Sequence, residues 1–379
     1  MRKLTYRWTS PELSPTGQAL LQSVVQSGQW SYGPVARQVE GQITASLGTV
    51  GTVLTNTGTS ALWILLTLAK RSATKRQSII VPAFGYSAAA NVAASLGYNV
   101  YVADSLADAP IVDPASISRL MDDSVAAVVG INYFGYAADW DQIPETDAYM
   151  LIEDAAGSFG ARYNDTPCGA QTKQAIFSFH TSKAAAAGGE GGGVVSTDPA
   201  IIERARTVGR NGHRAGYYFA ETSGMNMLMP DVAACFLRDS ILAYSETIDK
   251  RRRIVETLDQ IVSSLGLPTA DFNHSVQGRT QNYQTYALLA DNRDLVIATL
   301  RMNGIEARPC WPHLVTQQPA FAQAVARTDG DLARAAYFAD NIINIPVNPH
   351  IPTYHLDRLA AVLQRMKQAG IITTTRSMA

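Results

Sequence analysis

The N-terminal two-thirds of the chain alternates short apolar segments with longer segments of helical periodicity. Five apolar segments have the length of strands: Val50–Leu54, Ser78–Val81, Asn99–Ala103, Val125–Gly130 and Met150–Glu153. They lack a clean alternation of apolar and polar residues, which is typical of strands buried on both faces of a sheet. Because helical segments separate them, the pattern predicts an α/β fold with a mostly parallel central sheet flanked by helices.

Helical patterns also precede the first strand. Ser14-Pro15 is a helix-start signal and Gly28 is a plausible stop. A second helix is indicated by four apolar residues that share one helical face, Val35, Val39, Ile43 and Leu47.

The pattern changes after Asp198. A long helical stretch runs from Pro230 to about Leu265 and is closed by Gly266-Leu-Pro268. Beyond it we expect a smaller α+β domain, with strands at 285–290 and 305–308 and helices at 295–302 and 356–368. The predicted division is residues 1–245 for the large domain and 246–379 for the smaller one, which includes part of the long helix. The tail from Thr373 is expected to be frayed.

Composition narrows the class of protein. The chain has 379 residues, 46% of them hydrophobic and 17% charged, which is an ordinary globular balance. The net charge of -1 predicts no general attraction to nucleic acid or membranes. We expect no membrane span and no signal peptide. The three cysteines are far apart without metal-ligand spacing, so we expect a reduced, cytoplasmic protein without a metal site: Cys168, Cys235 and Cys310.

The first candidate for chemistry is a hydroxyl-rich segment, Asn56–Leu62, between a predicted strand and helix. The backbone N–H groups of a helix N-terminus and the helix dipole favour an anion there, such as a phosphate. The alternative is a simple helix cap, because Ser and Thr are common caps.

A second candidate is Asp154, at the end of a predicted buried strand. Ligands of open α/β sheets lie at the carboxyl ends of the strands, so this carboxylate could pair with the cationic ring nitrogen of a pyridoxal cofactor. The alternative is that Asp154 only caps the following turn.

The third candidate is Lys183, which follows the strand-like Phe177-Ser-Phe and precedes the glycine-rich Gly188–Gly193. This lysine could be a surface charge, a phosphate ligand or a nucleophile. Burial makes a lysine lose its proton more easily, and the neutral amine can form an imine with a carbonyl. Four features follow one another along the chain: the hydroxyl-rich segment Asn56–Leu62 (the anion loop), an aromatic residue after a strand, the strand-end Asp154, and Lys183. This order favours the nucleophile.

This order resembles the DegT/DnrJ/StrS family of PLP-dependent sugar aminotransferases, which have fold type I, as in aspartate aminotransferase. The resemblance extends over nearly the whole chain. The matching segments are Ser27–Pro34, Thr57–Leu62, Val81–Tyr86, Phe134-Gly135 with Asp139, Glu153–Ala156, Phe177–Gly192, Gly224–Asn226 with Asp231, and Arg308–Trp311 with Pro346.

The resemblance implies pyridoxal 5′-phosphate as cofactor. Lys183 would form the Schiff base and move protons, Asp154 would keep the ring nitrogen protonated, and Tyr86 would stack on the ring. The phosphate would be held by Gly58, Thr59, Ser60 and Ser178, with Asn226 from the other subunit of a homodimer.

The implied reaction has two halves. An amino acid, commonly glutamate in this family, leaves its amino group on the cofactor, and the keto group of a nucleotide-linked sugar or related polyol receives it. Substrate contacts are expected from His180, Arg308 and His313. For His180 the alternative is packing under the cofactor loop.

The chain departs from the family pattern at two positions that matter for the site. Gly157 stands where the family has a Gln that touches the ring hydroxyl, and Leu228 stands where the partner loop has an arginine. These departures leave open a PLP-dependent lyase or other non-transaminating enzyme on the same scaffold. A separate alternative is a binding or regulatory protein that has kept the fold without turnover. The presence of Lys183 argues against the dehydratase branch, in which a histidine replaces the lysine.

Overall fold

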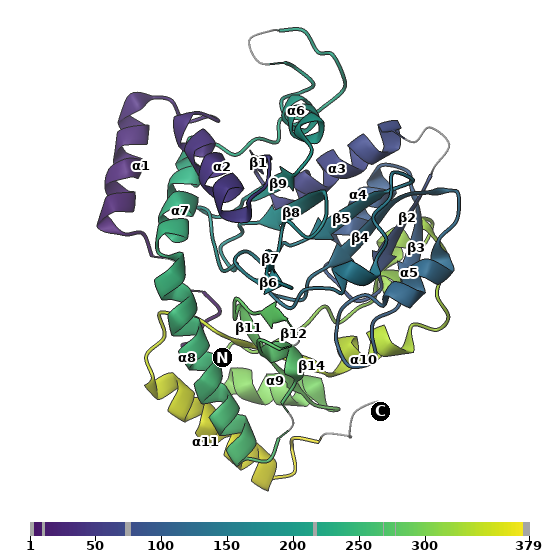
Figure 1. Ribbon diagram of the computed structural model, residues 1–379. Coiled ribbons are helices and arrows are strands. Elements are labelled where there is room, and N and C mark those ends of the chain that lie inside the picture. The colour runs from purple at the N-terminus through teal and green to yellow at the C-terminus, as the bar shows by residue number, and fades with distance from the viewer. Residues whose placement is uncertain are drawn as a thin grey trace.

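The structure is a computed structural model that describes residues 4–9, 12–72, 77–214, 218–267, 269–276 and 278–373. It contains a large α/β unit and a smaller unit below it in Figure 1. The helices α7 (Asp231–Leu242) and α8 (Tyr244–Ser264) run along one side of the molecule from the large unit to the smaller one. The long helical stretch predicted from Pro230 to Leu265 is therefore two helices, separated at Ala243.

The large unit is built on an eight-stranded sheet of order β1-β9-β8-β5-β4-β2-β3-β13. Strand β9 is antiparallel to its neighbours β1 and β8, and the other pairs are parallel, which confirms the prediction of a mostly parallel sheet. All residues of β1, β2, β4 and β9 are buried, which explains why these segments do not alternate. The bounds are β1 Gly51–Thr55, β9 Gly192–Ser196, β8 Gln174–Ser178, β5 Met150–Asp154, β4 Val125–Ile131, β2 Ser78–Pro82, β3 Asn99–Ala103 and β13 Val325–Thr328.

Helices cover this sheet, and their ends follow the sequence signals. Helix α1 (Pro15–Ser27) is capped by the Ser14 side chain, which accepts a hydrogen bond from the Gly17 amide, and ends at Gly28, whose φ is 71°. The predicted apolar face of α2 (Pro34–Leu47) is buried. The remaining helices of this unit are α3 Gly58–Ser72, α4 Ala88–Ser95, α5 Pro114–Leu120 and α6 Pro199–Val208.

The smaller unit has a three-stranded antiparallel sheet of order β11-β14-β12, formed by Thr285–Leu289, Ile342–Pro346 and Arg308–Pro309. It packs with α8, α9 (Arg293–Met302) and α11 (Tyr354–Gln368) around a core of its own. The strand predicted at 305–308 begins only at Arg308. Ile305 instead forms an isolated bridge with Tyr6, because the N-terminal segment covers it.

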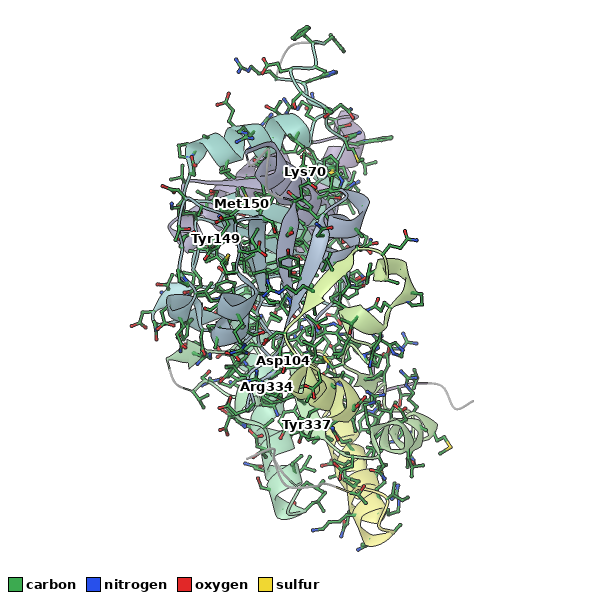
Figure 2. The ribbon with its side chains drawn as sticks, turned by 90° about the vertical axis from the view of Figure 1, so that its right-hand side faces the viewer. Lys70, Asp104, Tyr149, Met150, Arg334 and Tyr337 are labelled. Atoms are coloured by element: carbon green, nitrogen blue, oxygen red, sulfur yellow. The ribbon has the colours of Figure 1, made fainter. Side chains whose placement is uncertain are left out.

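Two segments cross the predicted division between residues 245 and 246. Tyr6 is fully buried in the core of the smaller unit, where its hydroxyl donates to the Pro346 carbonyl at 2.8 Å. In the other direction, β13 adds an edge strand to the large sheet. The following helix α10 (Ala333–Asn341) is tied to the large unit by Arg334, which lies beside Asp104 in Figure 2. Its guanidinium is 3.1 Å from Asp104 and 2.9 Å from Asp113. The position of the division itself stays a prediction.

The C-terminal tail was predicted to be frayed from Thr373. The backbone N–H of Thr373 donates to the Asn292 side chain at 3.3 Å, so this first residue of the tail has a partner. Residues 374–379 lie outside the described residues. Of the helices in the described parts of the chain, none is long and apolar enough to cross a bilayer.

Candidate active site

A cavity of about 640 Å³ lies where the two units meet. The carboxyl ends of β4 and β5 reach its wall through Ile131 and Asp154, which is the position where open α/β sheets bind ligands. The smaller unit closes the other side. Its contributions to the wall are Gln284, Arg308, Pro309, Cys310, Trp311 and Asn344.

Most of the residues predicted from the sequence line this one cavity. They come from the loop at the start of α3, the segment after β2, the end of β5, the segment around the end of β8 and strand β12. Their convergence depends on the parallel order of the strands, since parallel strands present their carboxyl ends on the same edge. The residues are Gly58, Thr59, Tyr86, Asp154, Ser178, His180, Lys183 and Arg308.

Three predicted residues lie outside the wall. The Ser60 hydroxyl is bonded to the Asn56 side chain at 2.6 Å and to the Thr57 hydroxyl at 2.9 Å, so it supports the anion loop from within. His313 is exposed at the surface. Asn226 is exposed too, which agrees with the expectation that it acts on the cofactor of another subunit; that role stays a prediction.

Asp154 ends β5 with only 5% of its surface exposed. Its Oδ1 accepts a hydrogen bond from the Ala156 amide at 3.0 Å, so the predicted turn cap is formed. The same side chain lines the cavity, and the two predicted roles are therefore compatible. Burial raises the pKa of Asp154 to about 6, opposed by the Ala156 amide and by the positive charge of Lys183.

Lys183 is partly buried in the loop after β8, and its backbone amide donates to the His180 carbonyl at 2.8 Å. Its Nζ lies 5.7 Å from the centroid of the Phe134 ring. Burial lowers the pKa of Lys183, and the negative charge of Asp154 opposes that shift. A surface-charge role does not fit a lysine in this position, whereas a nucleophilic amine does.

The anion loop packs closely on the neighbouring strands. A Cβ on Gly192 would lie 2.4 Å from the Gly58 amide nitrogen and 2.3 Å from the Thr57 carbonyl carbon, so only glycine fits there. Thr57 also caps α3, because its hydroxyl accepts the Ser60 amide at 3.0 Å. The N-terminus of this 15-residue helix thus opens onto the cavity with its positive dipole end.

Comparison with known proteins identifies the family. Residues 11–364 match the model of the DegT/DnrJ/EryC1/StrS aminotransferase family. The chain belongs to this family. It is an aminotransferase, and the resemblance seen in the sequence motifs is confirmed. Two relatives are named as transaminases, which favours this activity over the lyase alternative.

The curated relatives include two named transaminases. One, from Streptomyces venezuelae, is dTDP-3-amino-3,4,6-trideoxy-alpha-D-glucose transaminase, 28% identical over 90% of this chain and 89% of the relative. Another, from Pseudomonas aeruginosa, is UDP-2-acetamido-2-deoxy-3-oxo-D-glucuronate aminotransferase, 26% identical over 90% of this chain and 94% of the relative.

Solved structures share the fold. The Helicobacter pylori aminotransferase PseC has a TM-score of 0.87 at 19% identity, covering 96% of this chain and 99% of its own. A Streptococcus pneumoniae protein solved in its PLP form has a TM-score of 0.86 at 18% identity, over 96% and 98% of the two chains. These neighbours establish the fold-type-I architecture, and the family implies PLP as cofactor.

The cavity of this family member offers a partner for each polar end of PLP. A helix N-terminus with Thr57, Gly58 and Ser178 suits a phosphate, and the buried carboxylate of Asp154 suits a pyridinium. Lys183 supplies an amine with a lowered pKa in the wall of the same cavity. The residues present therefore fit the cofactor.

The Gly157 departure has a steric explanation. A Cβ at this position would lie 3.2 Å from Phe134 Cα and 3.3 Å from Gln284 Oε1. A side chain there would require Phe134 or Gln284 to shift by a few tenths of an ångström, and glycine avoids this. The second departure, Leu228, is half-buried and bridges to Thr55 of β1, so it packs against the sheet.

His180 lines the cavity while its ring is held by its own loop. The Ser182 amide donates to Nδ1 at 3.1 Å, so Nδ1 is an acceptor and the proton of the neutral ring is on Nε2. Nε2 lies 3.8 Å from Glu190. The His180 side chain is 43% exposed and lines the cavity, and its contact with substrate stays a prediction.

Several wall residues were given no role from the sequence. Phe134 adopts a φ of 43°, unusual for an aromatic residue, and its ring stacks on Trp311 at 5.2 Å. The Phe134-Gly135 pair belongs to a motif of the family, so the sequence did contain a signal for a role of Phe134 in the site. Trp8 and Gln284 carry no comparable signal, because they come from segments that meet the cavity only through the fold.

Proposed function

We propose that this aminotransferase moves an amino group from an amino acid, with glutamate as the leading candidate, to the keto group of a nucleotide-linked sugar or related polyol. The observation that carries the proposal is the placement of Lys183 and Asp154 in the wall of one cavity with the N-terminus of α3. Bound PLP would act as the electron sink and temporary carrier of the amino group.

Lys183 supplies the amine that bonds the cofactor and the base that moves a proton at the substrate carbon. Burial lowers its pKa, so the neutral amine needed for both tasks is more accessible than in water. Asp154 would keep a proton on the ring nitrogen of bound PLP, and a positive ring would in turn favour the ionised carboxylate. Thr57, Thr59 and Ser178 line the cavity at the start of α3 and the end of β8, and their hydroxyl groups would bind the phosphate.

The opposite part of the cavity suits a negatively charged substrate. Arg308 and Trp8 both line it, and the guanidinium carbon lies 5.1 Å from the centroid of the Trp8 ring. Glu306 pairs with Arg308 and also accepts the Trp8 amide at 2.9 Å, which fixes the N-terminal segment beside the arginine. The dTDP- and UDP-linked sugars in the names of two relatives support a diphosphate-bearing acceptor.

Arg308→Met is expected to raise KM for a nucleotide-linked keto sugar by about tenfold or more, since a charge-assisted hydrogen bond is lost. The Arg308→Lys variant retains the charge and should lose less. Steady-state kinetics with donor and acceptor varied separately would measure the change. An unchanged KM for both substrates would remove Arg308 from the substrate site.

We further propose a homodimer in which each subunit places Asn226 near the partner's cofactor. Large apolar side chains are exposed around this part of the chain: Trp30 is 54% exposed, Phe219 70% and Met225 48%. Such exposure supports contact with a second copy. The three cysteines are buried free thiols, which supports a reducing, cytoplasmic location.

Mixing two inactive variants tests the shared site. A mixed dimer of Lys183→Ala and Asn226→Ala chains has one site with both side chains intact and one with neither. Mixing after mild dissociation should therefore restore activity that neither variant shows alone. A monomer in sedimentation, or no recovery from verified mixed dimers, would contradict the proposal.

The donor and acceptor are tested by half-reactions. Glutamate should shift the visible spectrum of the PLP-loaded enzyme to that of its aminated form, and a panel of nucleotide-linked keto sugars should then reverse the shift. If no amino acid produced the first change, the proposed transamination would be wrong.

A further inference from the structure

Gln284 places an unpaired side-chain oxygen in the wall of the cavity. Its side chain is 3% exposed, and its Oε1 has no hydrogen-bond partner among the residues that the structure describes. An unpaired buried acceptor is unfavourable, because its lost hydration is not replaced. A ligand in the cavity would relieve that cost.

The amide lies beside the lysine loop and the Gly157 turn. Its Nε2 donates to the Ser182 carbonyl at 3.2 Å, one residue before Lys183. Its Oε1 points toward Gly157, where a Cβ would be 3.3 Å away. Gln284 therefore lies in tight contact with the position that a Cβ of residue 157 would take.

The backbone around Gln284 is held independently of its side chain. The Asn282 side chain accepts a hydrogen bond from the backbone N–H of Gln284 at 3.2 Å and donates one to the backbone carbonyl of Gly157 at 2.8 Å. These bonds fix Gln284 and Gly157 relative to each other. The buried Arg251 guanidinium donates to the Gln284 carbonyl at 3.3 Å. The Gln284 side chain therefore keeps two functions for a ligand: its unpaired Oε1 as an acceptor and, beside its bond to the Ser182 carbonyl, the second Nε2 hydrogen as a donor.

The chemistry of PLP shows which of its atoms remains without a partner. The proposed function assigns the phosphate to the α3 N-terminus, the ring nitrogen to Asp154 and the aldehyde carbon to Lys183. The remaining polar atom is the ring hydroxyl oxygen, on the ring carbon next to the one that bears the aldehyde. It must therefore lie near the Lys183 loop, where the Gln284 amide is.

We propose that Gln284, from the smaller unit, is the hydrogen-bond partner of the cofactor's ring oxygen, and that Gly157 is glycine to admit it. An amide suits this oxygen in either protonation state, because it carries both a donor and an acceptor. Gln284 is in this proposal a cofactor-binding residue and not a substrate contact. The inference rests on the proposed use of PLP by Lys183.

The test compares Gln284→Met, which removes both hydrogen-bonding functions, with Gln284→Glu, which removes the donor at nearly the same shape. Gln281→Met is the matched control. Gln281 is also buried, also donates to a backbone carbonyl and also has an unpaired Oε1, but it lies outside the cavity wall. For each protein three quantities are measured: the melting temperature without cofactor, the Kd for PLP, and the apparent pKa of the visible band of the lysine-bound cofactor.

Gln284→Met should weaken PLP binding by about tenfold, as expected for one buried hydrogen bond. Without cofactor its melting temperature should stay close to that of wild type, because the unpaired acceptor and the hydrogen bond to the Ser182 carbonyl are removed together. Both Gln284 variants should raise the apparent pKa of the visible band, because a donated hydrogen bond favours the ionised ring oxygen. Gln281→Met should leave PLP affinity and the band pKa unchanged.

Two results would overturn the inference. One is unchanged PLP affinity and band pKa in both Gln284 variants while KM for the keto substrate rises, which would make the amide a substrate contact. The other is a fall in melting temperature without cofactor and no change in the band, which would make it structural. Failure of wild type to form a borohydride-reducible adduct at Lys183 would instead refute the proposed function itself.

Discussion

Lys183→Ala should lose transaminase turnover by at least about 10⁴-fold while retaining the fold, because the same side chain bonds the cofactor and moves the proton. The loss should appear in both half-reactions, measured as single turnovers with the amino acid and with the keto sugar. Borohydride reduction followed by peptide mass spectrometry should give a pyridoxyl adduct on the Lys183 peptide of wild type and none on the variant.

The matched control is Lys173→Ala. Lys173 has half of its side chain exposed and pairs with the surface residue Asp147 at 3.3 Å, so its loss should leave turnover and adduct formation unchanged. Without cofactor, Lys183→Ala should melt no lower than wild type, since it removes an amine whose charged form is disfavoured by burial. Normal transamination by the Lys183 variant would refute the assignment.

Asp154→Asn should lower turnover strongly and, at the same time, stabilise the protein without cofactor. Burial raises the pKa of Asp154 from 3.8 to about 6, so the ionised carboxylate is about 3 kcal/mol less favourable in the folded chain than in the unfolded one. Asparagine is neutral and can still accept the Ala156 amide through Oδ1. It cannot hold a proton on the ring nitrogen by charge.

The sign of the pH dependence follows from the raised pKa. The protonated carboxyl is favoured in the folded state, so the penalty is absent below about pH 4 and complete above about pH 6. Without cofactor, the melting temperature of Asp154→Asn should exceed that of wild type at pH 7.5, and the difference should disappear near pH 4. With PLP bound the gain should shrink or reverse, because the ring cation then stabilises the wild-type carboxylate.

Glu153→Gln is the contrasting control. Glu153 is fully buried and its pKa is also raised, to about 7 by burial, but its oxygens accept hydrogen bonds from Asn132 at 2.7 Å and from the backbone amides of Gly169 and Gln171. A Gln amide would turn a donor toward those donors, so this variant should lower the melting temperature. Equal stabilisation by both variants would show that the effect at Asp154 is not specific to a ligand site.

The sequence by itself determined the elements that depend on local chemistry. The α1 boundaries follow from Ser14-Pro15 and Gly28, and the Asn56–Leu62 loop, Asp154 and Lys183 each lie next to a strand of the sheet. Because parallel strands have their carboxyl ends on the same edge of the sheet, residues that follow different strands meet there. The positions of the predicted strand ends were therefore enough to place these residues in one site. The family motifs added roles that local patterns do not contain.

Only the tertiary structure decided what completes the cavity. Trp8 and Gln284 reach it from the N-terminal segment and from the smaller unit, and the bond from the Trp8 amide to Glu306 joins residues nearly 300 positions apart. It also showed that β13 belongs to the large sheet and Tyr6 to the smaller core. Hydrophobic periodicity reports which face of an element is buried but not against which distant segment, and the reason for glycine at 157 became visible only when Phe134 and Gln284 were found beside it.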